Sequence, residues 1–442
     1  MSFDYRDVSV WVEEPADLQP ALDAELRCDV AIVGGGLTGL NAALALRAEG
    51  VDVVLLEMDF CGKGASGRNA GHLTPAIGKD VPTLVKQVGA ARAAEYIGFG
   101  ERAVRHTQQI FERYGIDCDY RPVGNIIAGV HPRHTEPLQR SAELAAGIGA
   151  EVRYLNEDEM RARKLPPVFR VGVLESCGGH LHPGKYVLGL RRAALSAGVR
   201  IFEATPVTGI EDGASPIKVL TPRGMLRADK LIVATNAYTP STLKRLKSKV
   251  FPLRDTMFQT ARLTDAQLDR LGWTGREGVY TAHESLESYR ITADGRLVGG
   301  SKHVQYGYNG ALIGGNDPAL FQKFADLLKV RFPEVPDLAI ESFWGGWICM
   351  TLDFLPLSFG NARGDVFYGL GYNGHGVAQA TLNGTMLADQ VLGRPNEDVA
   401  LLKRRVFPLP PEPLRWLALH ALKWRLGRTD GVVDADLRRG IV

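Results

Sequence analysis

Three closely spaced glycines, Gly34, Gly36 and Gly39, follow the apolar run Asp29–Val33. In a strand–turn–helix unit, the first such glycine allows a tight turn and the second lets the backbone approach a pyrophosphate. The third lets the helix pack against the strand. Glu57 stands eighteen residues after Gly39, at the end of the next apolar run, where a carboxylate can bind a ribose hydroxyl. A tight turn without a ligand is the alternative, but strand, helix, strand and acid together predict a dinucleotide-binding unit.

Two predicted helix starts offer backbone N–H groups to an anionic ligand. The first follows the glycine turn, so Leu37 and Thr38 are expected at the phosphates, beside the positive end of the helix dipole. The second is Gly374-His375-Gly376, before a predicted helix over 376–392. It would favour negative charge such as a reduced flavin carries at N1 and the C2 carbonyl. Glycine-rich turns before helices are common, so His375 could also be a structural histidine.

A run of small and polar residues follows Glu57 and is too polar for a core. Because it comes directly after the acid, we expect it over the cofactor, with Ala65, Ser66, Arg68, Asn69, Ala70 and Gly71 in contact. The Ser66 hydroxyl and the Arg68 guanidinium can bind phosphate oxygens. A flexible surface loop is the alternative. His72 ends the run and could orient a substrate or accept a proton from its ammonium, or it could simply hydrogen-bond the loop.

Tryptophans in the second half of the chain could wall a substrate cavity. Trp344 and Trp347 precede Thr351 and Asp353, which could fix the following loop. We expect Trp347 in the cavity wall, whereas Trp344 suits a core position equally well.

The composition is that of an ordinary globular protein. The 442 residues are 45% apolar and 23% charged, and the net charge of +2 gives no reason to expect nucleic acid as a partner. Five scattered cysteines without a CxxC pair argue against a disulfide framework and against a metal site. No segment suits a signal peptide or a membrane span, so we expect a cytoplasmic protein. The basic stretch 413–428 could lie on a membrane, but its charges fall between the leucines, which favours packing against the protein.

Apolar periodicity predicts a mixed α/β fold in which a second domain is inserted into the dinucleotide domain. The expected dinucleotide domain comprises 28–85, 150–248 and 341–400, and the expected substrate domain comprises 86–149 and 249–340. Residues 1–27 are expected to form a polar lead-in and 401–442 a helical tail.

Taken together, these motifs resemble the D-amino-acid oxidase superfamily, and within it the branch of gamma-glutamylputrescine, glycine and sarcosine oxidases. The shared motifs are the glycine turn with Glu57, the loop 64–71, Ala234–Tyr238, the run from Trp344 to Pro356, and Gly374-His375-Gly376. The resemblance implies bound FAD, which takes a hydride from the carbon next to an amine nitrogen, and hydrolysis of the resulting imine. It also implies a glutathione-reductase-type, Rossmann-like FAD domain with an inserted antiparallel-sheet substrate domain.

The resemblance also assigns further cofactor residues. Val207 corresponds to the position where such proteins pack backbone against the adenine ring. Thr235 and Asn236 lie in the matching Ala234–Tyr238 motif and are expected at the cofactor.

Two departures from the family pattern concern the substrate and the flavin tether. Amino-acid-specific relatives carry an arginine three residues before the Thr of the Thr-x-Asp pattern, and this arginine binds the substrate carboxylate. This chain has Ile348 at that position. Arg290, beside Tyr289, is the candidate to replace the arginine, although the pair could also lie on a solvated strand face. Relatives with covalent flavin use a cysteine five residues before that Thr or a histidine in the early loop. Here Cys349 lies two residues before it and Asn69 takes the histidine position, so we expect non-covalent FAD.

The expected function is oxidation of the C–N bond of a small amine or amino acid, a γ-glutamyl-amine being one candidate, with O2 or another acceptor receiving the electrons. One alternative is a flavoprotein dehydrogenase of an amino acid that passes electrons to a quinone or a carrier. A nicotinamide dehydrogenase leaves the loop at Ser66 and the Gly374-His375-Gly376 turn unexplained, and a monooxygenase would need a second Gly-Asp motif that we do not find. An FAD-binding subunit or assembly factor is the non-enzymatic alternative.

Overall fold

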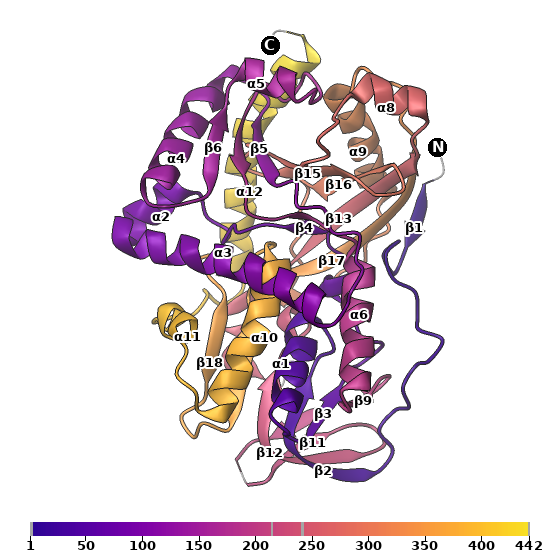
Figure 1. Cartoon of the computed structure of the whole chain (residues 1–442), viewed down its shortest axis with the longest axis vertical. Coiled ribbons are helices and arrows are strands. Elements are labelled where there is room, and N and C mark those ends of the chain that lie inside the picture. Colours follow the sequence, from indigo (N-terminus) through magenta and orange to yellow (C-terminus); the bar gives the residue numbers. More distant parts are fainter. Residues whose placement is uncertain (1–2, 214, 240–242, 441–442) are drawn as a thin grey trace.

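The computed structural model describes residues 3–213, 215–239 and 243–440, which form two large sheets with helices packed around them (Figure 1). The first sheet has β2 (Glu25–Val33) at its centre, with β3 (Val53–Leu56) and β12 (Met225–Val233) pairing to it in parallel. Its main strand order is β10-β11-β12-β2-β3-β9, with β19 against β12 and β18 against β19. The remaining strands are β9 (Arg200–Phe202), β10 (Gly209–Glu211), β11 (Ile217–Leu220), β18 (Leu357–Gly360) and β19 (Val366–Leu370).

Three helices pack beside one another in this domain. The helix α1 (Leu37–Ala48) lies between α10 (Gly376–Leu392) and α6 (Pro183–Ser196), and α10 also contacts the long α3 (Ala90–Arg113). The contact between α1 and α10 is close because Gly384 has no side chain: a Cβ there would lie 2.6 Å from the Cβ of Asn41. This contact brings the N-termini of α1 and α10 toward one cavity.

The second sheet is mostly antiparallel and has nine strands in the order β1-β17-β13-β16-β15-β14-β5-β7-β6. Its strands are β1 (Asp4–Arg6), β5 (Asn125–Gly129), β6 (Val152–Leu155), β7 (Val171–Glu175), β13 (Val250–Arg262), β14 (Gly278–Thr281), β15 (Glu287–Ile291), β16 (Arg296–Ser301) and β17 (Ile340–Thr351). The helix α9 (Pro318–Arg331) packs Phe321 and Phe324 against Phe258 and Phe343, so one face of the sheet is covered by an apolar core.

Shorter elements connect and flank the two sheets. The helices are α2 (Val81–Val88), α4 (Thr135–Gly147), α5 (Glu157–Ala162), α7 (Lys244–Lys247), α8 (Asp265–Leu271), α11 (Glu397–Leu402) and α12 (Leu414–Arg438). The strands β4 (His72–Leu73) and β8 (Gly179–His180) form a small separate sheet, and four 3-10 turns are η1 (Ala65–Gly67), η2 (Pro132–His134), η3 (Asn236–Tyr238) and η4 (Tyr308–Gly310).

The domain boundaries differ from those predicted from the sequence. β6, β7 and β17 belong to the nine-stranded sheet, although residues 150–248 and 341–400 were assigned to the dinucleotide domain. β1 of the expected lead-in also joins this sheet, in parallel with β17. The difference has a physical reason. A strand followed by a helix, as in β6 and α5, is typical of the dinucleotide domain, but β6 pairs antiparallel with β7, and the sequence around β6 does not show which strand it pairs with.

The C-terminal helix α12 is anchored to the nine-stranded sheet by acidic residues near its end. Asp430 accepts hydrogen bonds from the backbone N–H groups of Glu284 and Ser285, each at 2.9 Å. Asp434 forms ion pairs with Arg331 and Lys302, which also contact the buried Glu287. Glu287, Asp434 and His283 have the geometry of a metal-binding group, but Arg331 and Lys302 already supply positive charge there.

None of the helices in the described residues is long and apolar enough to cross a membrane.

Candidate active site

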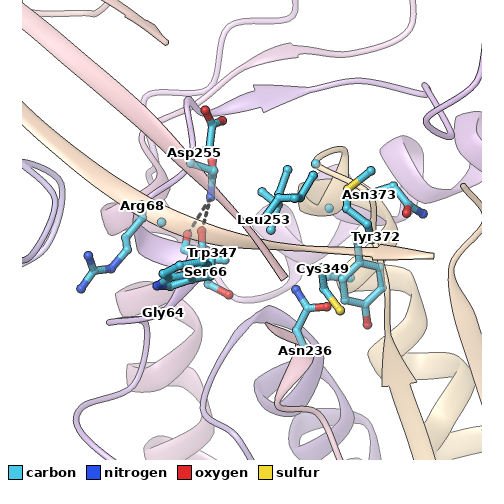
Figure 2. A pocket seen from close by; sticks show the side chains of 18 of the residues that line it. Gly64, Ser66, Arg68, Asn236, Leu253, Asp255, Trp347, Cys349, Tyr372 and Asn373 are labelled. Carbon is cyan, nitrogen blue, oxygen red and sulfur yellow. Dashed lines mark hydrogen bonds between the residues drawn. The ribbon is translucent and has the colours of Figure 1, made fainter. Parts of the chain in front are cut away.

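A cavity of about 810 Å³ lies between the two sheets and takes in most of the residues predicted for the cofactor. Figure 2 shows Gly64, Ser66 and Arg68 on one side and Asn236, Cys349, Tyr372 and Asn373 on the other. The wall includes these predicted residues: Gly34, Gly36, Leu37, Thr38, Glu57, Ala65, Ser66, Arg68, Asn69, Ala70, Gly71, His72, Val207, Thr235, Asn236, Trp347, Gly374, His375 and Gly376. Its volume lies within the range of small-molecule sites.

The glycine turn is built so closely that side chains would not fit. Gly34 has φ of 109°, and a Cβ there would lie 2.7 Å from the carbonyl oxygen of Ala234. A Cβ on Gly39 would lie 1.9 Å from the carbonyl oxygen of Gly34, so Gly39 lets α1 approach β2. At Gly36, at the start of α1, a Cβ would lie 2.8 Å from the Ser66 hydroxyl oxygen, so glycine lets the backbone approach Ser66 closely. The Leu37 N–H donates to that same hydroxyl at 3.0 Å.

The Glu57 carboxylate lies at the end of β3 and is held by two backbone groups. Its Oε2 accepts from the Gly35 N–H at 2.7 Å, and its Oε1 accepts from the Asp59 N–H at 3.1 Å. Burial raises the pKa of Glu57, against the opposing effect of these two hydrogen bonds. Each oxygen keeps acceptor capacity, as a ribose hydroxyl requires.

The loop after Glu57 is fixed by its own side chains. Asn69 donates from Nδ2 to the carbonyls of Ala65 (3.1 Å) and Ser66 (2.9 Å), and its Oδ1 accepts from the Gly71 N–H at 2.8 Å. Arg68 donates to the carbonyls of Lys63 (2.6 Å) and Gly345 (2.8 Å). The Arg68 guanidinium was expected to bind a phosphate. In the structure it instead connects the loop to β17 through these hydrogen bonds.

The N-terminus of α10 points its free N–H groups at the same cavity. His375 stands at the N-cap without a side-chain cap bond, and its Nδ1 lies 3.0 Å from the carbonyl oxygen of Asn373. The turn before it needs left-handed backbone, with φ of 53° at Asn373 and 83° at Gly374. Burial lowers the pKa of His375, so this position adds no positive side-chain charge at neutral pH.

His72 is buried at the cavity wall and is neutral. Its Nδ1 lies 3.0 Å from Oδ1 of Asn125, whose Nδ2 donates to the Leu73 carbonyl at 2.9 Å. Because the amide nitrogen of Asn125 is used as a donor, its oxygen faces His72 as an acceptor, and the proton of His72 belongs on Nδ1. Burial lowers the pKa of His72 to about 3. Its Nε2 is buried and has no hydrogen-bond partner among the described residues, so it is a free acceptor.

Tyr289 and Arg290 lie outside the cavity, contrary to the sequence prediction. Tyr289 packs in the apolar core on the far face of β15 and donates from its hydroxyl to Glu287 at 2.8 Å. The Arg290 guanidinium donates to the Ala70 carbonyl and lies 5.1 Å from the Trp11 ring centre. Ser288, the residue before Tyr289, is the β15 residue that lines the cavity. Strand alternation explains Tyr289, because adjacent residues point to opposite faces.

Sequence reasoning missed two groups of cavity residues. Asp255 and Ser301 come from β13 and β16, and Leu419, Leu422, Lys423 and Leu426 come from α12. The signal for Asp255 was present: Phe251, Leu253 and Met257 flank it at period two, so it is a charge on an apolar strand face. No local pattern shows which surface α12 covers. It contacts the protein in part, with Asp430 and Val433 buried, whereas Leu414, Leu417 and Trp424 are each more than half exposed.

Fold and site together define a flavoprotein oxidoreductase, and the family match agrees: the chain belongs to the DAO family of FAD dependent oxidoreductases, which matches residues 29–390. It is 30% identical over 417 residues to gamma-glutamylputrescine oxidoreductase of Escherichia coli (strain K12), covering 92% of this chain and 95% of that protein. It is 24% identical over 376 residues to glycine oxidase of Bacillus licheniformis, covering 84% and 94%.

Solved structures with the same fold include two amino-acid-oxidising enzymes. Glycine oxidase from Geobacillus kaustophilus superposes with a TM-score of 0.71 at 22% identity, over 86% of this chain and all of that one. L-proline dehydrogenase from P. horikoshii superposes with a TM-score of 0.70 at 18% identity, over 85% and 96%. The fold class predicted from the sequence is thus confirmed.

The residues present fit the FAD that the family implies. Gly36 lines the cavity at the start of α1 without a side chain, which suits the close backbone approach of a pyrophosphate, and Glu57 offers carboxylate oxygens at the end of β3. A second helix start, at α10, offers N–H groups further along the same cavity. The pyrophosphate and the reduced flavin ring are the two parts of FAD that carry negative charge.

Proposed function

We propose that this enzyme oxidises the C–N bond of a small amine or amino acid to an imine, which water hydrolyses to an aldehyde or keto product. Bound FAD supplies the hydride acceptor. The observation that carries the proposal is one continuous cavity, which joins Gly36 and Glu57 to an apolar chamber beneath the nine-stranded sheet. An amine held in that chamber is kept out of bulk water beside the start of α10.

His72, Trp347 and His375 are the residues that we propose for this chamber. His72 lines the cavity with a neutral imidazole whose Nε2 is fully buried, so its proposed role is to shape the chamber wall beside the substrate. Trp347 lines the cavity, and its ring lies on the face of the sheet that also carries the Arg254 guanidinium, 6.0 Å from the ring centre, opposite to the face of Asp255. His375 fixes the turn that aims the α10 N–H groups.

The FAD is proposed to be held without a covalent bond. Cys349 lines the cavity, but burial raises the pKa of its thiol to about 12. Because the thiolate is the nucleophilic form of cysteine, this residue is a poor candidate for a tether.

An amine with a carboxylated arm, such as a γ-glutamyl-amine, is the narrower substrate proposal. One support is the 30% identity to gamma-glutamylputrescine oxidoreductase. The other is Lys423 of α12, which lines the cavity and uses one ammonium donor on the Val304 carbonyl at 2.7 Å. Among the described residues its other two donors have no hydrogen-bond partner, so they could bind a carboxylate at the cavity's outer end.

Flavin bleaching under anaerobic conditions tests this function. The panel contains simple amines, α-amino acids and amines with a γ-glutamyl arm, and we expect the flavin absorbance to disappear with amines and fastest with the γ-glutamyl group. Admitting air then shows whether O2 is the electron acceptor. Rapid return of the flavin absorbance indicates an oxidase, and slow return indicates a dehydrogenase that uses a quinone or a carrier. A flavin that stays oxidised with the whole panel contradicts the proposal.

A further inference from the structure

One carboxylate, Asp255, stands among apolar neighbours of β13 on the roof of the substrate chamber. Alternate residues of β13 line the cavity, namely Phe251, Leu253, Asp255 and Met257. The ladder with β17 sets Met350 opposite Phe251, Ile348 opposite Leu253 and Gly346 opposite Asp255. Figure 2 shows Leu253 and Asp255 above the turn that carries Gly64 and Ser66.

The residue opposite Asp255 is Gly346, so β17 places no side chain against the carboxylate. The backbone of Gly346 packs closely on Arg68, because a Cβ on Gly346 would lie 3.3 Å from the Cβ of Arg68. Paired residues of an antiparallel ladder share one face, so the missing side chain of Gly346 would have lain beside the Asp255 carboxylate. Asp255 is partly exposed, and the cavity is what it is exposed to.

Asp255 has hydrogen bonds but no ion-pair partner in the part of the chain that the structure describes, although the charge of Arg254 acts to lower its pKa. Its Oδ2 accepts from the Ser301 hydroxyl at 2.9 Å, and its Oδ1 accepts from the Thr256 N–H at 2.8 Å. Among the described residues, no lysine, arginine or histidine forms an ion pair with it, whereas Lys302, next to Ser301, is paired with Glu287 and Asp434. Arg254 donates to the Tyr5 hydroxyl at 3.0 Å, and alternation along β13 puts it on the opposite face.

Because the Asp255 carboxylate has no ion-pair partner among the described residues, its burial is only partly compensated. Burial raises the pKa of Asp255 to about 6, so it is ionised at neutral pH but destabilised. Two of its four acceptor positions are filled by protein donors. A charged group out of bulk water gains most from a partner that brings both opposite charge and hydrogen-bond donors.

We propose that Asp255 binds an ammonium group of the substrate. This inference rests on the proposed function and narrows its substrate class to cationic amines, with the ammonium beside Gly346. The ammonium belongs either to the reacting nitrogen or to a second nitrogen further along the substrate. A plain α-amino acid fits less well, because its carboxylate would approach Asp255 with like charge.

Binding of tert-butylammonium tests the assignment without any turnover. This cation has no hydrogen on the carbon next to nitrogen, so it can bind but cannot be oxidised, and tert-butanol is its neutral counterpart. Calorimetric titration of the FAD-bound enzyme gives both dissociation constants. We expect Asp255→Asn to weaken tert-butylammonium binding about tenfold to a hundredfold and to leave tert-butanol binding within about twofold.

The matched control is Glu284→Gln, the same chemical change at an exposed carboxylate on the rim of the cavity, which should alter ammonium binding less than about twofold. Should Asp255→Asn fail to retain FAD, Asp255→Ser gives the same comparison with a smaller side chain. Unchanged ammonium binding in an FAD-retaining Asp255 variant overturns the proposal.

Substrate comparison then locates the bound ammonium. If Asp255→Asn raises KM for 1-aminobutane and 1,4-diaminobutane alike, Asp255 holds the reacting nitrogen; if it does so for the diamine alone, it holds the second nitrogen. If the wild-type enzyme oxidises no amine, the proposed function is wrong. The tert-butylammonium titration still tests whether Asp255 binds an ammonium group. The two failures are therefore distinguishable.

Discussion

The Glu57 carboxylate is oriented by protein groups alone, through the N–H groups of Gly35 and Asp59. This arrangement holds the carboxylate in place, so a ribose hydroxyl finds an acceptor that needs no rearrangement. It also means that loss of the carboxylate leaves the Gly35 N–H without its partner.

We expect Glu57→Ala to raise the dissociation constant for FAD about tenfold to a hundredfold, because a hydrogen bond to a charged acceptor contributes about 1.5–3 kcal/mol. Glu57→Gln keeps one acceptor oxygen and should have a smaller effect. Fluorescence titration of apoprotein with FAD measures both. The titration requires FAD that is not covalently bound. Acid precipitation of the wild type checks this, because non-covalent flavin stays in the supernatant and colours it. Equal FAD affinity in Glu57→Ala and wild type would refute the ribose assignment.

The neutral state of His72 has a consequence for acid stability. Its pKa is about 3 in the fold, against 6.5 for an unperturbed histidine. Between these values the unfolded chain binds the proton and the native state does not, so the free energy of unfolding falls as pH drops from 6.5 toward 3.

His72→Asn should make this fall shallower, since asparagine does not titrate. Urea unfolding of apoprotein at a series of pH values, followed by tryptophan fluorescence, gives the slope. Above pH 7 the histidine is neutral in both states, so the two proteins should there show parallel curves. A slope below pH 6 that is as steep in the variant as in the wild type would show that His72 is charged in the fold.

At the scale of elements, α12 connects the surface of the molecule to the substrate chamber. One part of the helix lines the cavity through Leu419, Lys423 and Leu426, while its end is held by Asp430 and Asp434. The anchoring acids are therefore distinct from the residues that face the chamber.

Asp430→Ala should loosen α12, because two backbone N–H groups lose their charged acceptor, at a cost of about 1.5–3 kcal/mol each. Limited trypsin digestion measures the release through faster cleavage after Arg425 and Arg428, which are exposed. Asp430→Asn retains one acceptor oxygen and should fall between wild type and alanine. Cleavage at the wild-type rate in Asp430→Ala would mean that other contacts hold the helix.

The sequence predicts the dinucleotide half of the molecule much better than the substrate half. Gly34, Gly36, Gly39 and Glu57 act within one local βαβ unit, so their spacing fixes their geometry. The substrate sheet is assembled from segments far apart in the chain, such as β5 beside β14 and β1 beside β17. Its order cannot be read from local periodicity. Arg290 shows the limit, because its strand and the loop at Ala70 are both predicted from the sequence, but the contact between them is not.

Over the whole molecule, one cavity takes its walls from both sheets. The parallel sheet contributes the dinucleotide cradle, and the nine-stranded sheet contributes the chamber roof (Figure 1). β17 ties the two halves together, since Arg68 of the cofactor loop donates to Gly345 and the Trp344 indole donates to the Arg68 carbonyl. Movement of the roof relative to the cofactor is thereby restricted.

The position of α12 also has a consequence for the order in which the protein is made. The cradle at Gly34–Glu57 is synthesised first, and the helix that closes the chamber is synthesised last among the elements described. A nascent chain therefore carries the glycine turn long before it has a substrate chamber. The sheet around that turn also needs β12 and β19, and α1 packs on α10, so the cofactor cradle and the chamber are both completed late in synthesis.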